Sequence, residues 1–327
     1  MTLLKLSSTG GGFELEIARA AAVLREGGLV AFPTETVYGL GADATNALAV
    51  ARLFEAKERP HFDPLIVHLG AAGWLDRCVA TVPPQARRLA QRFWPGPLTL
   101  VLPKRAIIPH IVTSGLPSVA VRVPSHPVAH ALICALDRPL AAPSANRFSR
   151  LSPTTAQAVV DDLGGRIELI LDAGPTTHGI ESTIVAFGEQ GPRLLRPGPI
   201  TLEELRDCLG CDVTVVRKPT PTPEAPGMLE RHYAPRTPLR LWESQPPAMN
   251  VKRVGCLAFR VAPAGNFAAV EILSPAGDLR EAAANLFAAL HRLDAAGADL
   301  IVAEQVPETG LGVAIMDRLR RAAKQTP

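Results

Sequence analysis

Short apolar runs alternate with segments of helical spacing along the first two-thirds of this 327-residue chain. Helices are predicted at residues 14–28, 46–60, 82–96, 126–136 and 152–165. Strands are predicted at 29–32, 64–69, 97–103, 118–124, 139–146 and 167–174, and a hairpin at 181–187 and 193–198. Because several neighbouring strands lack an intervening helix, the pattern predicts an α/β fold with a mixed sheet.

A proline-rich break follows this unit. The segment VVRKPTPTPEAPGMLERHYAPRTP, residues 215–238, cannot sustain a helix or a central strand and predicts an extended connector. Behind it, strands at 254–260 and 299–306 and helices at 278–297 and 310–324 form a compact α/β unit. We therefore predict a large domain at residues 1–217, a linker at 218–238 and a smaller domain at 239–327.

Composition narrows the function classes. A net charge of +3 and an aromatic content of 5% argue against a protein whose main role is to coat nucleic acid. The five cysteines lack a repeating spacing, which favours a reducing compartment and indicates no metal site. No apolar run approaches the roughly 18 residues of a membrane span, and no signal peptide is recognised. We expect a soluble, cytoplasmic protein without membrane contact.

Polar clusters flank the predicted strands. The apolar run at 29–32 leads into PTETVYGLG, and further clusters are AKERP before PLIVH, then APSAN, GIESTIV and LLRPG. Because strand ends in an α/β sheet gather near one crevice, where such folds bind ligands, these loops predict the walls of one site.

Four cations lie in these clusters or in a neighbouring strand: Lys57 and Arg59 in AKERP, Arg196 in LLRPG, and Arg122 in the strand segment VAVRVP. Guanidinium groups match phosphate and carboxylate oxygens, and opposite charges ~4 Å apart gain roughly 4 kcal/mol at an effective dielectric near 20. Three such cations would hold a triphosphate. Because the chain has no G-x-x-x-x-G-K-[ST] loop, a nucleotide would be held by scattered side chains.

The chain resembles the YrdC/Sua5 family in the order of its motifs, which are PTETVYGLG, AKERP, PLIVH, APSAN, SPTTA, GPTTHGIESTIV and LLRPG. The segment APGMLERHYAP and the tail beyond it are similar to the linker and C-terminal domain of the Sua5 members. The resemblance implies a YrdC-like twisted mixed sheet and a smaller, Rossmann-like C-terminal α/β domain. It also implies a nucleotidyltransferase, threonylcarbamoyl-AMP synthase, which makes threonylcarbamoyl-AMP and pyrophosphate from L-threonine, bicarbonate or CO2, and ATP for the t6A modification at position 37 of tRNA.

The resemblance assigns residues as well. Threonine would be bound by Thr36, His68, Arg122, the Ala142 backbone and Ser182. ATP would be bound by Lys57, Arg59, Asp63, Ser118, Ser144, Asn146, Ser152, Arg196, His232 and Tyr233, with Lys57 and Arg59 as the catalytic cations. His232 and Tyr233 would fold over the phosphates, so that the linker acts as a lid. Mg²⁺ would arrive with ATP, and downstream threonylcarbamoyl transferase machinery would receive the product.

Alternatives stay open for several of these residues. His68 also fits a core histidine, Arg122 a buried ion pair, and His232 and Tyr233 simple domain docking. Asp63 replaces the asparagine usual in the family, which leaves its ATP contact open. The tail DRLRRAAK is predicted to be a solvated helix face, with tRNA contact as the alternative.

Two other functions also remain open. One is an RNA-binding module of the same fold without catalysis. The other is a related carbamoyl-transfer enzyme.

Overall fold

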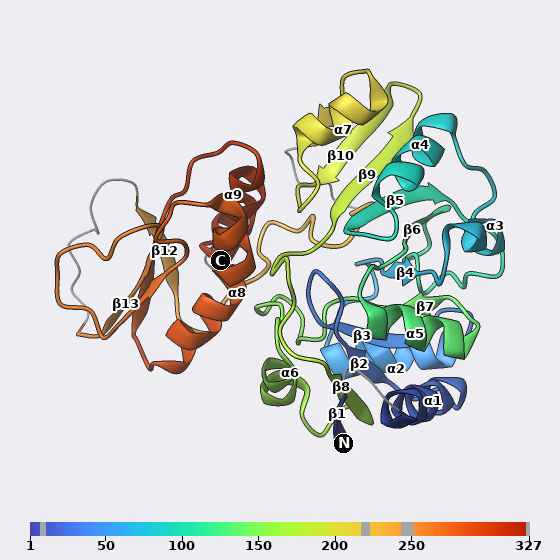
Figure 1. Ribbon diagram of the computed structural model, residues 1–327, viewed down its shortest axis with the longest axis horizontal. Coiled ribbons are helices and arrows are strands. Elements are labelled where there is room, and N and C mark those ends of the chain that lie inside the picture. The colour runs from blue at the N-terminus through green and yellow to red at the C-terminus, as the bar shows by residue number, and fades with distance from the viewer. Residues whose placement is uncertain (7–10, 217–222, 243–251, 325–327) are drawn as a thin grey trace.

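The computed structural model describes residues 1–6, 11–216, 223–242 and 252–324. Figure 1 shows two α/β units. We call the elements up to residue 215 the N-terminal unit, those from residue 239 the C-terminal unit, and residues 223–238 the linker. The predicted boundary between residues 217 and 218 lies outside the described residues, as does the end of the tail beyond residue 324.

The N-terminal unit is built on a mixed sheet, as predicted. Parallel pairs such as β4 with β6 stand beside antiparallel pairs such as β5 with β6, and β9 pairs antiparallel with β10, which confirms the predicted hairpin. In spatial order the described strands are β1 (Thr2–Lys5), β8 (Leu169–Asp172), β2 (Val30–Phe32), β3 (Gly39–Asp43), β7 (Leu140–Ala141), β4 (Ile66–His68), β6 (Ser118–Arg122), β5 (Leu98–Pro103), β9 (Thr183–Gly188), β10 (Gly191–Arg196) and β11 (Thr214–Val215).

The prediction of a loop at PTETVYGLG is partly wrong. The end of the motif PTETVYGLG begins strand β3, which pairs antiparallel with β2. Glycine is depleted in strands, so the local pattern gives no strand signal here. The reason for glycine is close packing, since a Cβ on Gly41 would lie 3.0 Å from side-chain atoms of both Phe32 and Leu140. The sequence reading also missed β1 and helix α7 (Leu202–Leu209).

Helices cover the two ends of the sheet differently. At the end that contains β2, helices α1 and α5 pack on one face and α2 and α6 on the other. At the end that contains β5, helices α4 and α7 cover one face, while Ile66, Ala120 and Leu195 on the other pack against Ala225 and Met228 of the linker. In chain order, the bounds of these helices and of α3 are α1 (Gly11–Arg25), α2 (Ala47–Lys57), α3 (Leu75–Cys78, after a 3-10 turn at Ala72–Trp74), α4 (Pro84–Phe93), α5 (Pro127–Leu136) and α6 (Ala156–Leu163).

The C-terminal unit is a smaller parallel α/β unit, as predicted. Its strands, in spatial order, are β12 (Leu239–Trp242), β15 (Leu300–Glu304), β13 (Val254–Ala258) and β14 (Ala269–Ile272), of which β12 and β14 carried no sequence prediction. Helices α8 (Leu279–Ala295) and α9 (Leu311–Ala322) lie on the side facing the N-terminal unit (Figure 1). Within the described ranges, no helix is long and apolar enough to cross a membrane.

The two units share an apolar cluster. Val37 and Ile180 of the N-terminal unit and Tyr233 of the linker belong to the same buried cluster as Phe287 of α8 and Ile315 of α9. Because this cluster includes Val37, which follows the threonines of the PTETVYGLG motif, the C-terminal unit packs directly against the predicted site.

Candidate active site

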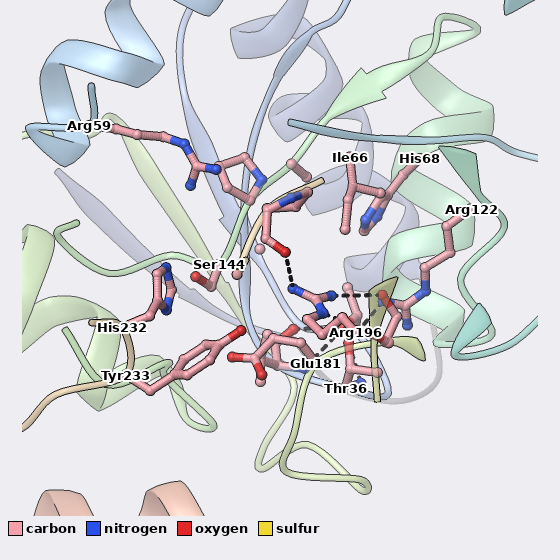
Figure 2. A pocket seen from close by; sticks show the side chains of 18 residues that line it. Thr36, Arg59, Ile66, His68, Arg122, Ser144, Glu181, Arg196, His232 and Tyr233 are labelled. Carbon is pink, nitrogen blue, oxygen red and sulfur yellow. Dashed lines mark hydrogen bonds between the residues drawn. The ribbon is translucent and has the colours of Figure 1, made fainter. Parts of the chain in front are cut away.

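A cavity lies on the sheet face that the linker covers (Figure 2). Strand β4 contributes Ile66 and His68 to its lining, two residues apart and therefore on the same face of the sheet. The site is thus formed on a face of the sheet as well as by loops at strand ends. Among the assigned residues, those that line it are Thr36, Arg59, His68, Arg122, Ala142, Ser144, Ser182, Arg196, His232 and Tyr233.

Thr34 shapes the turn that follows β2. Its hydroxyl donates to the Val37 carbonyl at 2.6 Å and accepts from the Thr36 and Val37 amides at 3.2 and 3.3 Å. The Thr34 and Thr36 hydroxyl oxygens are 2.8 Å apart, so Thr36 is the donor in that bond, because the one hydroxyl proton of Thr34 is already used. The polar residues after β2 therefore close a turn and present Thr36 to the cavity.

Arg122, at the end of β6, forms a buried ion pair with Glu35. Its Nη2 lies 2.7 Å from Glu35 Oε1, and Nη1 donates to Thr36 Oγ1 at 2.9 Å. Burial favours a raised pKa for Glu35, but the Arg122 guanidinium outweighs it and lowers the pKa to about 2. The ion-pair alternative for Arg122 is therefore present in the structure, and the same side chain also lines the cavity.

His68 lines the cavity as a neutral ring. Burial, and then the charge of Arg122, lower the pKa of His68 to about 3. Its ring stands edge-on to Phe32 with centroids 6.2 Å apart, and Nδ1 has no hydrogen-bond partner in the described part of the chain. Since buried polar atoms are normally paired, this nitrogen keeps a hydrogen-bonding position for a ligand.

Lys57 and Arg59, the two predicted catalytic cations, are held differently. Arg59 lines the cavity and pairs with Asp63, its Nη2 lying 2.8 Å from Oδ2. Lys57 lies behind the wall, where Nζ donates to the carbonyl oxygens of Ser144, at 2.5 Å, and Asn146. Burial, and then the neighbouring Arg59, lower the pKa of Lys57 well below its ordinary value. Lys57 thus fixes the loop that presents Ser144.

Arg196 donates its hydrogen bonds to neutral acceptors. It is 4% exposed and donates to the Ser182 carbonyl at 3.0 Å, to Ser182 Oγ at 3.1 Å and to the Pro226 carbonyl at 3.3 Å. Those acceptors are neutral, and no ion pair of Arg196 occurs among the described residues, in contrast to Arg59 and Arg122. A buried charge without a counter-charge costs several kcal/mol, so Arg196 is the cation most suited to an anionic ligand.

The linker closes the cavity through Pro226, Gly227, His232 and Tyr233. Gly227 has φ +81°, and a Cβ there would lie 2.4 Å from Tyr233 Oη, so the conformation requires glycine. The rings of His232 and Tyr233 are 4.1 Å apart, and both are buried. Burial, and then Arg59, lower the pKa of His232 well below its ordinary value, which leaves the imidazole neutral.

Besides Lys57, four residues that the family resemblance assigns to the site lie outside the cavity lining. Asp63 is paired behind Arg59, Asn146 donates to the Arg147 and Arg150 carbonyls at 2.7 and 3.1 Å, and Ser152 donates to Glu181. The structure does not bring Ser118 to the cavity, and its backbone pairs with Pro103. These residues support the wall, except Ser118, for which no contact with the site is seen.

Sequence reasoning missed Glu181 and Arg318. Glu181 lines the cavity, and its place directly before Ser182 is the one signal that the sequence contains. Arg318 is 1% exposed and bonds to Glu181, so the solvated-face prediction for DRLRRAAK is wrong at this residue. Arg320 and Lys324 of the same segment are exposed, as predicted.

Comparisons with known proteins cover most of the chain and include both units. The Sua5, YciO and YrdC family model, described as telomere recombination, matches residues 22–198, and the model for the threonylcarbamoyl-AMP synthase C-terminal domain matches 200–324. The threonylcarbamoyl-AMP synthase of Pyrococcus abyssi is 46% identical over 95% of this chain and 94% of its own length, and that of Bacillus subtilis 44% over 94% and 93%. The crystal structure of P. abyssi Sua5 complexed with L-threonine aligns with a TM-score of 0.91 and 42% identity, covering 99% of this chain and 98% of that one.

Proposed function

The chain belongs to the Sua5/YrdC family of threonylcarbamoyl-AMP synthases, and from this premise we propose that it is a nucleotidyltransferase that makes threonylcarbamoyl-AMP and pyrophosphate. Its substrates would be L-threonine, bicarbonate or CO2, and ATP, and its product would serve the t6A modification of tRNA. The observation that supports this most is Arg196, a buried guanidinium in the cavity with neutral partners only. A polyphosphate would supply an anionic partner for the Arg196 guanidinium.

We propose that threonine binds between Thr36, His68, Arg122, the Ala142 backbone and Ser182, all of which line the cavity. Arg122 donates from Nε to the Gly96 carbonyl and from Nη1 to Thr36 Oγ1, while Nη2 is in ion-pair contact with Glu35 but makes no hydrogen bond among the described residues. N–H groups of the guanidinium therefore remain for the substrate carboxylate. The neutral His68 ring offers a hydrogen bond without adding a second positive charge. The relative crystallised with L-threonine supports the choice of amino acid.

The reaction depends on positioning and charge. The threonine amine adds to the carbon of CO2 and loses a proton, which gives a carbamate. A carbamate oxygen then attacks the α-phosphorus of ATP, and the bond from phosphorus to the bridging oxygen breaks to release pyrophosphate. Arg196 and Arg59 neutralise charge that develops on the phosphate oxygens, and the side chains of the threonine pocket align the carbamate for attack.

Mg²⁺ belongs to the ATP substrate in this proposal. No group of three or more His, Cys, Asp or Glu residues that would hold a metal ion is found in the described part of the chain. The three carboxylates closest to the proposed chemistry, Glu35, Asp63 and Glu181, are each paired with an arginine. Mg²⁺ commonly binds phosphate oxygens and keeps several waters, so such a site needs few protein ligands.

We further propose that the linker is a lid. With Gly227, His232 and Tyr233 in place, the cavity has about 40 Å³ of free space. Because one water needs roughly 10–15 Å³ on the same measure, this space holds only a few waters and ATP requires the linker to open. Closing it again around the substrates would protect the carbamate from water.

Three further points remain part of the proposal. The protein acts in the cytoplasm, and it passes its product to threonylcarbamoyl transferase machinery. The exposed Lys324 of the tail offers a residue for tRNA contact.

The direct test is mass spectrometry of the purified protein incubated with ATP, L-threonine, bicarbonate and Mg²⁺. We expect a threonylcarbamoyl-AMP product and release of pyrophosphate, both of which disappear when threonine is omitted. Salt-sensitive RNA binding without threonine-dependent pyrophosphate release would instead support an RNA-binding module. Turnover that requires carbamoyl phosphate in place of threonine would support the related carbamoyl-transfer reaction.

A further inference from the structure

Glu181 places a carboxylate in the wall of a cavity that otherwise gathers positive charge. Its Oε1 accepts a hydrogen bond from Ser152, and its Oε2 accepts from Arg318 Nε at 3.0 Å. Both carboxylate oxygens are therefore occupied by partners other than Arg196. Figure 2 shows Glu181 and Arg196 among the side chains that line the cavity.

Arg318 comes from the C-terminal unit. It lies on α9, is 1% exposed, and also donates to the Pro197 carbonyl at 2.6 Å and to Asp317 Oδ2 at 3.0 Å. Its guanidinium carbon is 5.2 Å from the ring centroid of Tyr233. One buried side chain of the C-terminal unit thus contacts the N-terminal unit, the cavity wall and the linker.

Arg196 and Glu181 are coupled through their neighbours. Arg196 donates to both the carbonyl and the hydroxyl of Ser182, the residue that follows Glu181. Arg59 and Arg122, the other arginines of the cavity lining, already pair with carboxylates, whereas Arg196 has no ion pair among the described residues. If Glu181 lost its two hydrogen-bond partners, its carboxylate could pair with Arg196, which lines the same cavity. Such a pair would occupy the guanidinium that the proposed function assigns to phosphate.

We propose that Arg318 is a positioning residue of the active site: it holds the Glu181 carboxylate away from Arg196 and thereby keeps Arg196 open to the phosphates of ATP. This inference rests on the proposed function, in which Arg196 binds phosphate. It gives the C-terminal unit a defined part in substrate binding, through one side chain on α9.

The test measures ATP dissociation constants by calorimetry for variants of the full chain. It compares variants that keep the Glu181 carboxylate with variants in which glutamine replaces it. We expect R318M to weaken ATP binding about tenfold or more, because Glu181 then pairs with Arg196. We expect the double variant E181Q/R318M to recover to within about threefold of the wild type, because its amide carries no charge to compete. A purely structural role for Arg318 predicts no such recovery.

The matched control is R320M. Arg320 lies on the same helix, but its ion pair with Glu308 is on the surface, with both side chains nearly half exposed. R320M should bind ATP like the wild type. If R318M does not fold, the double variant is compared with E181Q, since neither has an unpaired carboxylate at residue 181. Equal ATP affinities in that comparison support the proposal.

The proposal is overturned if R318M binds ATP as tightly as the wild type, or if E181Q/R318M binds it about tenfold more weakly than E181Q. Failure of the proposed function gives a different result. ATP binding by the wild type without threonine-dependent pyrophosphate release would reject the proposed reaction and leave this comparison valid. A wild type that binds no ATP would reject both.

Discussion

Replacing Arg196 by methionine should affect activity and stability in different ways. A guanidinium ~4 Å from a phosphate oxygen contributes roughly 4 kcal/mol at an effective dielectric near 20, part of which offsets the desolvation of both charges. At about 1.4 kcal/mol per factor of ten, we expect kcat/KM for ATP to fall about 10²–10³-fold in R196M.

The stability of R196M should change little. The variant loses three hydrogen bonds to neutral acceptors, but it also removes a buried charge that forms no ion pair in the described part of the chain. These contributions oppose each other, and we expect them to cancel to within about 1 kcal/mol. R122M is the matched comparison, because it leaves Glu35 buried without its partner and should lose about 3–5 kcal/mol.

Pyrophosphate release at saturating threonine, with ATP varied, gives kcat/KM, and urea unfolding of each variant gives the change in stability. The expected pattern is a stable R196M with strongly reduced kcat/KM and a clearly destabilised R122M. If R196M loses as much stability as R122M and keeps kcat/KM within about threefold of the wild type, Arg196 is a structural residue and the proposed phosphate site is wrong.

Two further predictions concern the lid and the pH dependence. G227A should lower kcat/KM about tenfold or more, because the added Cβ meets Tyr233 Oη at 2.4 Å. G210A is the control, since Gly210 has a similar positive φ and no atom lies within 4 Å of the added Cβ. Equal losses of kcat/KM in both variants would contradict the proposed lid. For His68, the unfolded chain binds a proton below about pH 6.5 while the folded pKa is about 3, so the free energy of unfolding falls as pH drops between these values. H68N should remove about 2 kcal/mol of the loss between pH 7 and pH 5 in urea unfolding, and an unchanged loss would show that His68 is protonated in the folded protein.

Much of the architecture can be predicted locally. Helix α2 begins after Asn46, whose side chain accepts from the Leu48 and Ala49 amides, and α6 begins after Thr155, which accepts from the Ala158 amide. Such caps and the apolar periodicity depend on residues within a few positions of each other, so they can be read from the chain. Strand β3 could not be predicted in this way, because the reason for its glycines is the packing of Phe32 and Leu140 against it.

The chemical groups of the site can be read from the chain: the arginines, the hydroxyl groups and the glycine-containing linker occur in an order that identifies the family. Which charges neutralise one another follows from the folded structure. Glu35 pairs with Arg122 and Glu181 with Arg318, across 87 and 137 positions of the chain, while Arg196 forms no ion pair among the described residues. Charge pairing depends on distance and desolvation in space, and neither can be read from separation along the chain.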